Sequence, residues 1–182
     1  MKKTYVKDIM VPLSDYATVS KNANLLEAIL ALENETKTYG EKPYRHQSVL
    51  VVDEKGDVIG KVSQMDIMAA LEPNYKKIGT DIDLSHYGFS LAFIKAMQDQ
   101  YDLWEKPLAE LCNNVDTINV TKIMYTPADN QKVKKSDTLD TAMHQILMGR
   151  HHSLLVTKRN KIVGILRSTD VFNCLFDKIG AC

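Results

Sequence analysis

Cysteine is scarce in this 182-residue chain, and the few cysteines form no recognisable framework. Cys112, Cys174 and Cys182 are odd in number and include no Cys-x-x-Cys pair. We therefore expect free thiols in a reducing cytoplasm and no disulfide scaffold. A metal site is not expected either, because the adjacent His151 and His152 would point to opposite faces of an extended strand.

Net charge, long apolar runs and catalytic motifs are also missing. Lys and Arg together number 23, as do Asp and Glu, so no bulk attraction to nucleic acid is expected. No apolar run approaches the ~20 residues that span a bilayer, and no signal-type stretch follows the first residues, so we expect no membrane insertion. Neither a Gly-x-Ser-x-Gly sequence nor a reactive-cysteine motif is present, which argues against an enzyme.

What the chain does have is an internal repeat, which constrains the architecture before local propensities are considered. The matched segments are 6–10 with 120–124, 45–52 with 150–156, and 58–67 with 162–171. The sequence offset falls from 114 to 105 and then 104 along these matches, so the first copy carries extra residues within 33–44 and in the 53–57 turn. Insertions at expected loops are typical of a structural repeat.

The repeat divides the chain into copy one (1–72), an insert (73–119) and copy two (120–182). Each copy has roughly 60–70 residues and would bury too little surface to be comfortably stable alone. We therefore expect the two copies to pack together as one pseudo-two-fold unit with clefts between them.

Each copy is expected to fold as strand–helix–strand–strand–helix, an α+β arrangement. Apolar residues at helical spacing predict the first helix, and β-branched runs on either side of a turn predict a hairpin. We expect three-stranded sheets with both helices of a copy on one face, and Gly149 as a helix C-cap. The predicted helices are 24–32, 63–71, 138–148 and 168–176, and the hairpin strands are 48–52, 58–62, 153–157 and 161–166.

The insert holds an aromatic segment that follows an irregular stretch at 79–86. Its apolar residues fall near helical spacing, with a break expected at Pro107. This helix could pack across the two copies, form a dimer contact, dock a partner or cover a ligand, and the sequence leaves these alternatives open. The residues are Phe89, Phe93, Met97, Tyr101, Trp104, Leu108 and Leu111.

The two copies resemble the CBS domain, and their duplication resembles a CBS pair, or Bateman module. The resemblance is carried by segments 8–12 and 122–127 and by the two glycine-led strand-to-helix turns, and it covers about 6–72 and 120–178. It implies a stand-alone regulatory module, with two CBS domains in pseudo-two-fold arrangement, that binds an adenine nucleotide between the copies. It also implies a homodimer formed through the helical faces.

The family's ligand turn reads Gly-apolar-apolar-Ser/Thr-x-x-Asp, and copy one supplies Gly60, Ser63 and Asp66. A helix that begins at Ser63 offers backbone N–H groups to a phosphate, and Asp66 can accept hydrogen bonds from a ribose diol. The alternative is that Ser-x-x-Asp is only a helix capping box.

The equivalent turn of copy two has Asp170 at the ribose position, but Arg167 replaces the hydroxyl residue. Arg167 could contact a phosphate or be a salt-bridged surface arginine, and Ser168 is expected to cap the helix. The resemblance also implies base-side residues, and it pairs His46 with Asp170 and His152 with Asp66. For the Arg-His pairs at 45–46 and 150–151, capping of the preceding helix is the alternative. The base-side residues are Thr18, Val19, Arg45, His46, Gln47, Lys132, Val133, Arg150, His151 and His152.

The sequence thus predicts an energy-sensing module that needs no obligatory cofactor and signals to an unidentified partner protein. The resemblance implies AMP, ADP or ATP as the regulatory ligand, with S-adenosylmethionine or NAD as further candidates. The alternative is a dimerisation or scaffold module that binds no ligand.

Overall fold

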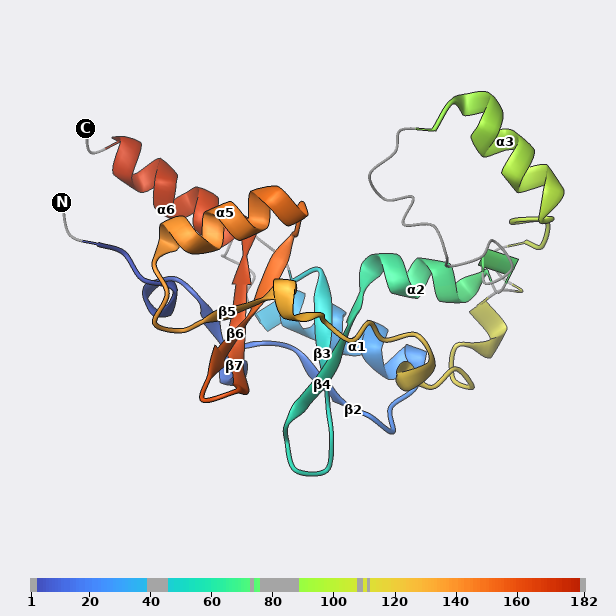
Figure 1. Cartoon of the computed structure of the whole chain (residues 1–182). Coiled ribbons are helices and arrows are strands. Elements are labelled where there is room, and N and C mark those ends of the chain that lie inside the picture. Colours follow the sequence, from blue (N-terminus) through green and yellow to red (C-terminus); the bar gives the residue numbers. More distant parts are fainter. Residues whose placement is uncertain are drawn as a thin grey trace.

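Two β-sheets, one centred on each copy of the repeat, lie beside each other and carry the helices (Figure 1). The computed structural model describes residues 3–38, 46–72, 74–75, 89–107, 110 and 112–180. Within the described residues, no helix is long and apolar enough to cross a membrane.

Copy one has the predicted order of strand, helix, hairpin and helix. Strand β2 pairs in parallel with β3, and β3 pairs antiparallel with β4 across the turn at 53–57. The elements are β2 (Thr18–Ser20), α1 (Leu25–Thr38), β3 (Ser48–Val52), β4 (Val58–Ser63) and α2 (Gln64–Leu71).

Copy two repeats this order, but its sheet has four strands. The additional strand is β1 (Val11–Pro12), which belongs to copy one by sequence and pairs antiparallel with β7. The prediction of three strands was therefore correct for copy one and wrong for copy two. The elements of copy two are β5 (Lys132–Lys134), α5 (Leu139–Gly149), β6 (Ser153–Lys158), β7 (Lys161–Arg167) and α6 (Ser168–Gly180).

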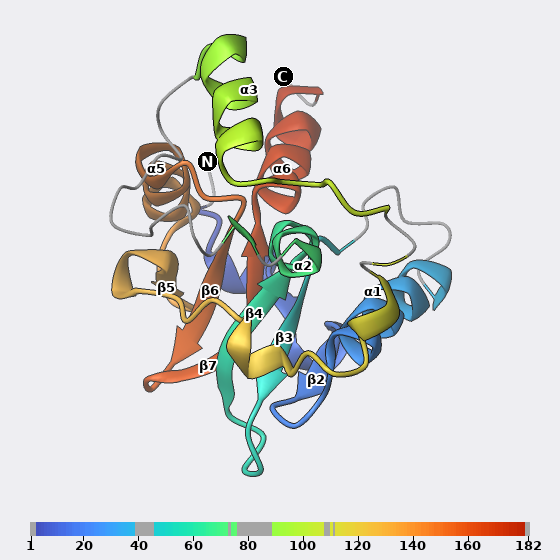
Figure 2. The ribbon, with the colours of Figure 1, turned by 90° about the vertical axis from the view of Figure 1, so that its right-hand side faces the viewer.

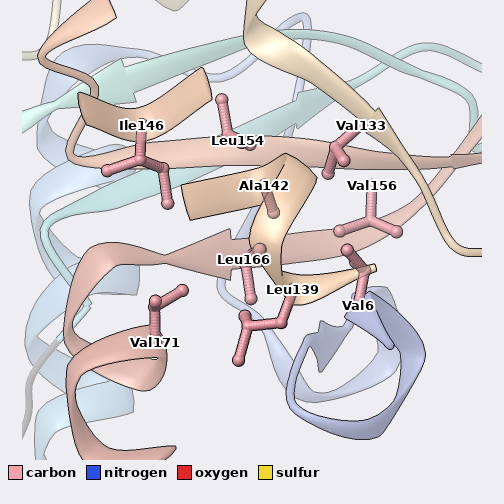
Figure 3. Packing of buried hydrophobic residues seen from close by; sticks show 9 residues of the cluster. All are labelled: Val6, Val133, Leu139, Ala142, Ile146, Leu154, Val156, Leu166 and Val171. Atoms are coloured by element: carbon pink, nitrogen blue, oxygen red, sulfur yellow. The ribbon is translucent and has the colours of Figure 1, made fainter. Parts of the chain in front are cut away.

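Strand β1 belongs to an exchange of short segments between the copies. The N–H of Val6 donates to the carbonyl of Asp137 at 2.9 Å, and the Val6 side chain lies in the core of copy two (Figure 3). Reciprocally, the N–H of Val120 donates to the carbonyl of Ala23 at 2.9 Å, and the Val120 side chain lies in the core of copy one. Each copy thus completes the core of the other.

Alternation along the strands separates a helix-facing side from an inter-copy side. In copy two, Leu154 and Val156 pack in the core beneath the helices (Figure 3). Leu155 between them packs instead in a central cluster with Leu50 of copy one. This period of two places both helices of a copy on one face of its sheet and leaves the other face for the neighbouring copy. The central cluster is formed by Tyr16, Leu50, Leu155 and Ile165, all buried.

The hairpin turns of the two copies point in the same direction, toward one edge of the molecule (Figures 1 and 2). The Lys161 ammonium lies 2.8 Å from Oδ1 of Asp57 and joins the β6–β7 hairpin to the turn of the β3–β4 hairpin. Because both side chains are well exposed, this ion pair links the two hairpins but contributes little to the free energy of unfolding.

Gly149 ends α5 as its last helical residue, and Arg150 rather than Gly149 adopts the left-handed conformation, with φ 49°. The predicted glycine C-cap was therefore displaced by one residue. The reason for glycine is steric, because a Cβ at this position would overlap the His151 imidazole.

The insert forms a shorter helix than its apolar spacing predicted. Helix α3 (Leu91–Gln100) buries none of its residues and projects beyond α2, away from both sheets (Figure 1). Asp102 and Trp104 take positive φ values of 52° and 62°, which end the helix before Pro107. Packing of this helix across the two copies is therefore not observed, and residues 79–86, Leu108 and Leu111 lie outside the described residues.

Candidate functional site

The aspartate turn of copy one is a complete capping box. Ser63 donates to Asp66 Oδ2 through both its N–H, at 2.7 Å, and its hydroxyl, at 2.6 Å, and the Asp66 N–H donates back to Ser63 Oγ at 3.2 Å. These bonds use only one carboxylate oxygen, and no hydrogen bond among the described residues reaches Asp66 Oδ1. Capping and ligand binding are therefore compatible at this turn.

The aspartate turn of copy two is closed by an arginine fork. Arg167 donates from Nε to Asp170 Oδ2 at 2.7 Å and from Nη2 to Oδ1, and its backbone N–H donates to Oδ2 at 3.2 Å. The side chains of Arg167 and Asp170 are only 17% and 13% exposed. Both oxygens of the expected ribose carboxylate thus already have charged partners, as in the salt-bridged alternative.

Arg167 also connects this turn to the base-side segment of copy one. Its Nη1 lies 3.5 Å from Nδ1 of His46, whose ring packs edge-on against Tyr16 with the centroids 4.1 Å apart. His46 is buried, and the hydroxyl of Tyr16 lies 3.0 Å from Ser48 Oγ. The structure therefore brings His46, Arg167 and Asp170 together across the copy boundary.

Lys61 makes the corresponding connection at the other turn. Its ammonium lies 3.4 Å from Oγ of Ser153, which follows His152 in copy two. Burial lowers the pKa of Lys61 below its usual value, and the negative charge of Asp66 opposes this shift in part. No ion pair to Lys61 is present among the described residues, so a partly buried positive charge that interacts with the charge of Asp66 remains available.

The first-turn N–H groups expected to hold a phosphate are partly occupied by the protein. The Gln64 N–H donates to the Gln47 carbonyl at 3.0 Å, and the Ser168 N–H donates to the His152 carbonyl at 2.9 Å. The Asp66 N–H is also used, by Ser63. A phosphate at α2 therefore needs a further donor, and the Lys61 ammonium, which interacts with the charge of Asp66, is a candidate.

The other predicted base-side residues have varied surroundings. Val133 is buried in the core of copy two, so only its backbone can face a ligand. Lys132 pairs with Asp129 at 3.0 Å. Thr18 and Val19 form β2 beside Leu50 and Val51, Arg150 and His152 are exposed, and Arg45 lies outside the described residues.

The capping alternative for the base-side segment of copy two also has structural support. The N–H of His151 donates to the Ile146 carbonyl at 3.0 Å, at the end of α5. The backbone of Arg150 and His151 thus terminates the helix, whatever their side chains contact.

The motif glycines make room for the exchanged segments. A Cβ on Gly60 would lie 2.7 Å from Met124 Sδ and 3.1 Å from the Tyr125 carbonyl oxygen. A Cβ on Gly164 would overlap the Val11 carbonyl. Contact between Gly60 and a ligand stays a prediction, but packing alone is a sufficient reason for glycine here.

The sequence analysis missed Lys61 and Tyr16. A signal for Lys61 was present, since lysine occupies a motif position that is apolar in copy two, where Ile165 stands. Tyr16 carried no such signal, because its contact with His46 depends on how the copies pack.

A cavity of about 420 Å³ lies against α6 and is open to solvent. Asp170 contributes to its wall, but none of the predicted base-side residues does. The lining residues are Ile9, Asp170, Asn173, Cys174, Asp177 and Lys178.

This geometry is accompanied by a family match. The CBS domain model matches residues 6–73 and 120–177, which is more than half of the chain, and the chain therefore belongs to the CBS domain family. The two matched segments make it a tandem CBS pair. No curated protein matches the sequence.

Solved structures show the same fold at low sequence identity. The crystal structure of CBSX2 in complex with AMP has a TM-score of 0.57 at 18% identity, covering 96% of this chain and 97% of that one. A CBS domain-containing protein of unknown function from Bacillus anthracis has a TM-score of 0.63 at 17% identity, with coverages of 96% and 94%. The CBS domain of a bacterial CNNM/CorC family Mg²⁺ transporter in complex with ATP has a TM-score of 0.54 at 15% identity, with coverages of 93% and 85%.

Proposed function

We propose that this CBS pair is a regulatory module that binds an adenine nucleotide, AMP, ADP or ATP. The observation that carries the proposal is the Asp66 turn, which keeps Oδ1 without a described hydrogen bond and whose negative charge acts on the Lys61 ammonium. Lys61 in turn reaches Ser153 of copy two, so a ligand here would touch both copies. AMP and ATP are the ligands of two similar structures, whereas S-adenosylmethionine and NAD find no support there.

The module acts by binding rather than by catalysis. A nucleotide that bridges the copies favours one arrangement of the pair. A partner protein that binds this arrangement more tightly therefore responds to whether the nucleotide is bound. Ligand and partner then strengthen each other's binding reciprocally, as energy sensing requires. Free Cys112 and Cys174 agree with a cytoplasmic setting.

The test is a thermal-shift panel of AMP, ADP, ATP, S-adenosylmethionine and NAD on the wild type and on Asp66→Asn. A nucleotide at ~100 times its dissociation constant stabilises the wild type by about 2.7 kcal/mol. The Asp66→Asn variant loses that shift, while the matched change Asp99→Asn, at an exposed position on α3, keeps it. Absence of a shift with every nucleotide at millimolar concentration would overturn the proposal.

The second candidate is a dimerisation or scaffold module without a small ligand. It is favoured by the Arg167–Asp170 fork, which satisfies one aspartate turn internally, and by exposed apolar side chains on the repeat helices. Under this function, Asp66→Asn changes only the local stability of α2, by roughly 1 kcal/mol.

A further inference from the structure

The two aspartate turns are equivalent in the repeat but differ in what their carboxylates already bind. The clefts that the repeat predicts between the copies are named after these turns: the Asp66 cleft, with Lys61 and Ser153, and the Asp170 cleft, with Arg167 and His46. In the Asp66 cleft one carboxylate oxygen has no described hydrogen bond. In the Asp170 cleft both oxygens accept charge-assisted hydrogen bonds from Arg167.

A ribose diol would have to displace this fork to reach Asp170. The diol offers two neutral O–H donors, whereas Arg167 offers two charged N–H donors in a planar geometry that matches a carboxylate. Both side chains are mostly buried, so solvent screens their attraction less than it would at the surface. Exchanging the fork for a diol is therefore unfavourable unless the released guanidinium finds another anion.

The positive charges of the two clefts are also arranged differently. In the Asp170 cleft the guanidinium is held against Asp170 and beside the buried His46. In the Asp66 cleft the Lys61 ammonium has no ion-pair partner among the described residues, and it donates a hydrogen bond to the neutral Ser153 hydroxyl. In the Asp66 cleft a phosphate can therefore pair with the Lys61 ammonium. In the Asp170 cleft the positive charge of Arg167 is already neutralised by Asp170.

We propose that Arg167 closes the Asp170 cleft from within, so that each chain binds one nucleotide, in the Asp66 cleft. The inference rests on the proposed function and adds to it the stoichiometry and the residue that sets it. Arg167 then serves as a specificity residue that occupies the ribose carboxylate of one cleft and leaves the other for the ligand.

The experiment is a calorimetric titration of the full chain with ATP and, separately, with AMP. The wild type is expected to bind one equivalent, and Asp66→Asn in the wild-type background is expected to bind none. Arg167→Ser gives copy two the hydroxyl residue that copy one has at this motif position, and it removes the partner of Asp170. This variant is therefore expected to bind two equivalents. The double variant Arg167→Ser with Asp66→Asn is expected to bind one.

Three results separate failure of this inference from failure of the proposed function. Two equivalents in the wild type, or one remaining in Asp66→Asn, overturn the closed Asp170 cleft while leaving nucleotide binding intact. Weaker binding by Arg167→Ser also overturns it, since Arg167 would then be a phosphate ligand. No binding of ATP or AMP by the wild type or by Arg167→Ser overturns the proposed function itself. The Asp66→Asn arm needs no Arg167 variant, so the inference is testable even if Arg167→Ser does not fold.

Discussion

Lys61 and Ser153 meet across the boundary between the two copies, with Lys61 Nζ 3.4 Å from Ser153 Oγ. The repeat equivalent of Lys61 is Ile165, which is completely buried in the central cluster. One position of the repeat therefore carries a positive charge in copy one and apolar packing in copy two. Substituting Lys61 is therefore the most direct way to test whether the two clefts differ in function.

Replacing Lys61 by Met should weaken ATP binding by about 10- to 100-fold, because a charge-assisted contact contributes roughly 1.5–3 kcal/mol. Adenosine, which has no phosphate, should bind wild type and variant alike. Calorimetric titration with both ligands measures the difference. The matched control is Lys55→Met in the exposed 53–57 turn, which should leave ATP binding unchanged. Equal loss of adenosine and ATP binding would show that Lys61 acts through the fold and not on a phosphate.

The lowered pKa of Lys61 gives a pH dependence of known sign. Burial disfavours the ammonium in the folded state, so between the lowered folded pKa and the ordinary value of 10.5 the unfolded chain binds more protons. The free energy of unfolding therefore gains a positive slope with pH in that window, and the cost of burying the charge is fully present below it. Any stability advantage of Lys61→Met over wild type should shrink as the pH rises toward 10.5. Urea unfolding of both proteins across this range checks the trend, which a constant difference would contradict.

Substituting alanine for the two motif glycines should show how closely each packs against the exchanged segment. Gly164→Ala places a Cβ against the backbone carbonyl of Val11, which cannot move aside, and should cost about 2–3 kcal/mol. Gly60→Ala meets first the flexible Met124 side chain and should cost about 1 kcal/mol. Gly180→Ala has no atom within 4 Å and serves as the control. Chemical unfolding without nucleotide measures all three, and a larger cost for Gly60→Ala would contradict the order.

The predicted homodimer can be tested on α6, whose Phe172 and Phe176 are 64% and 68% exposed. Large apolar side chains on one helix face favour burial against a second copy of the chain. The double change of Phe172 and Phe176 to Glu should convert a dimer into a monomer by light scattering. Leu91→Glu, an equally apolar and exposed position on α3, should leave the mass unchanged. A monomeric wild type would contradict the predicted homodimer.

Much of each copy was predictable because burial on one face imposes a regular pattern on sequence. The apolar runs of β3 and β6 and the helical spacing at Leu139, Ala142 and Ile146 correctly placed the elements and the helix-facing core. The exchange of Val6 and Val120 was not predictable. An apolar residue indicates that a position is buried, but it does not indicate in which copy's core it is buried. The role of Arg167 was not predictable either. Its two interpretations, a phosphate contact and a salt bridge, differ only in the direction that its side chain takes.

The exchange of segments between the copies also predicts which copy is destabilised when an exchanged valine is truncated. Val6→Ala removes two methyl groups from a completely buried site and should cost about 2 kcal/mol. Although Val6 belongs to copy one by sequence, it packs in the core of copy two with Val133, Leu139 and Val156 (Figure 3). Hydrogen exchange should therefore show faster exchange in β5, β6 and α5, and Val120→Ala should show it in β2, β3 and α1. Loss of protection by Val6→Ala chiefly in β2, β3 and α1 would refute the exchange, since the cavity would then lie in copy one, to which Val6 belongs by sequence.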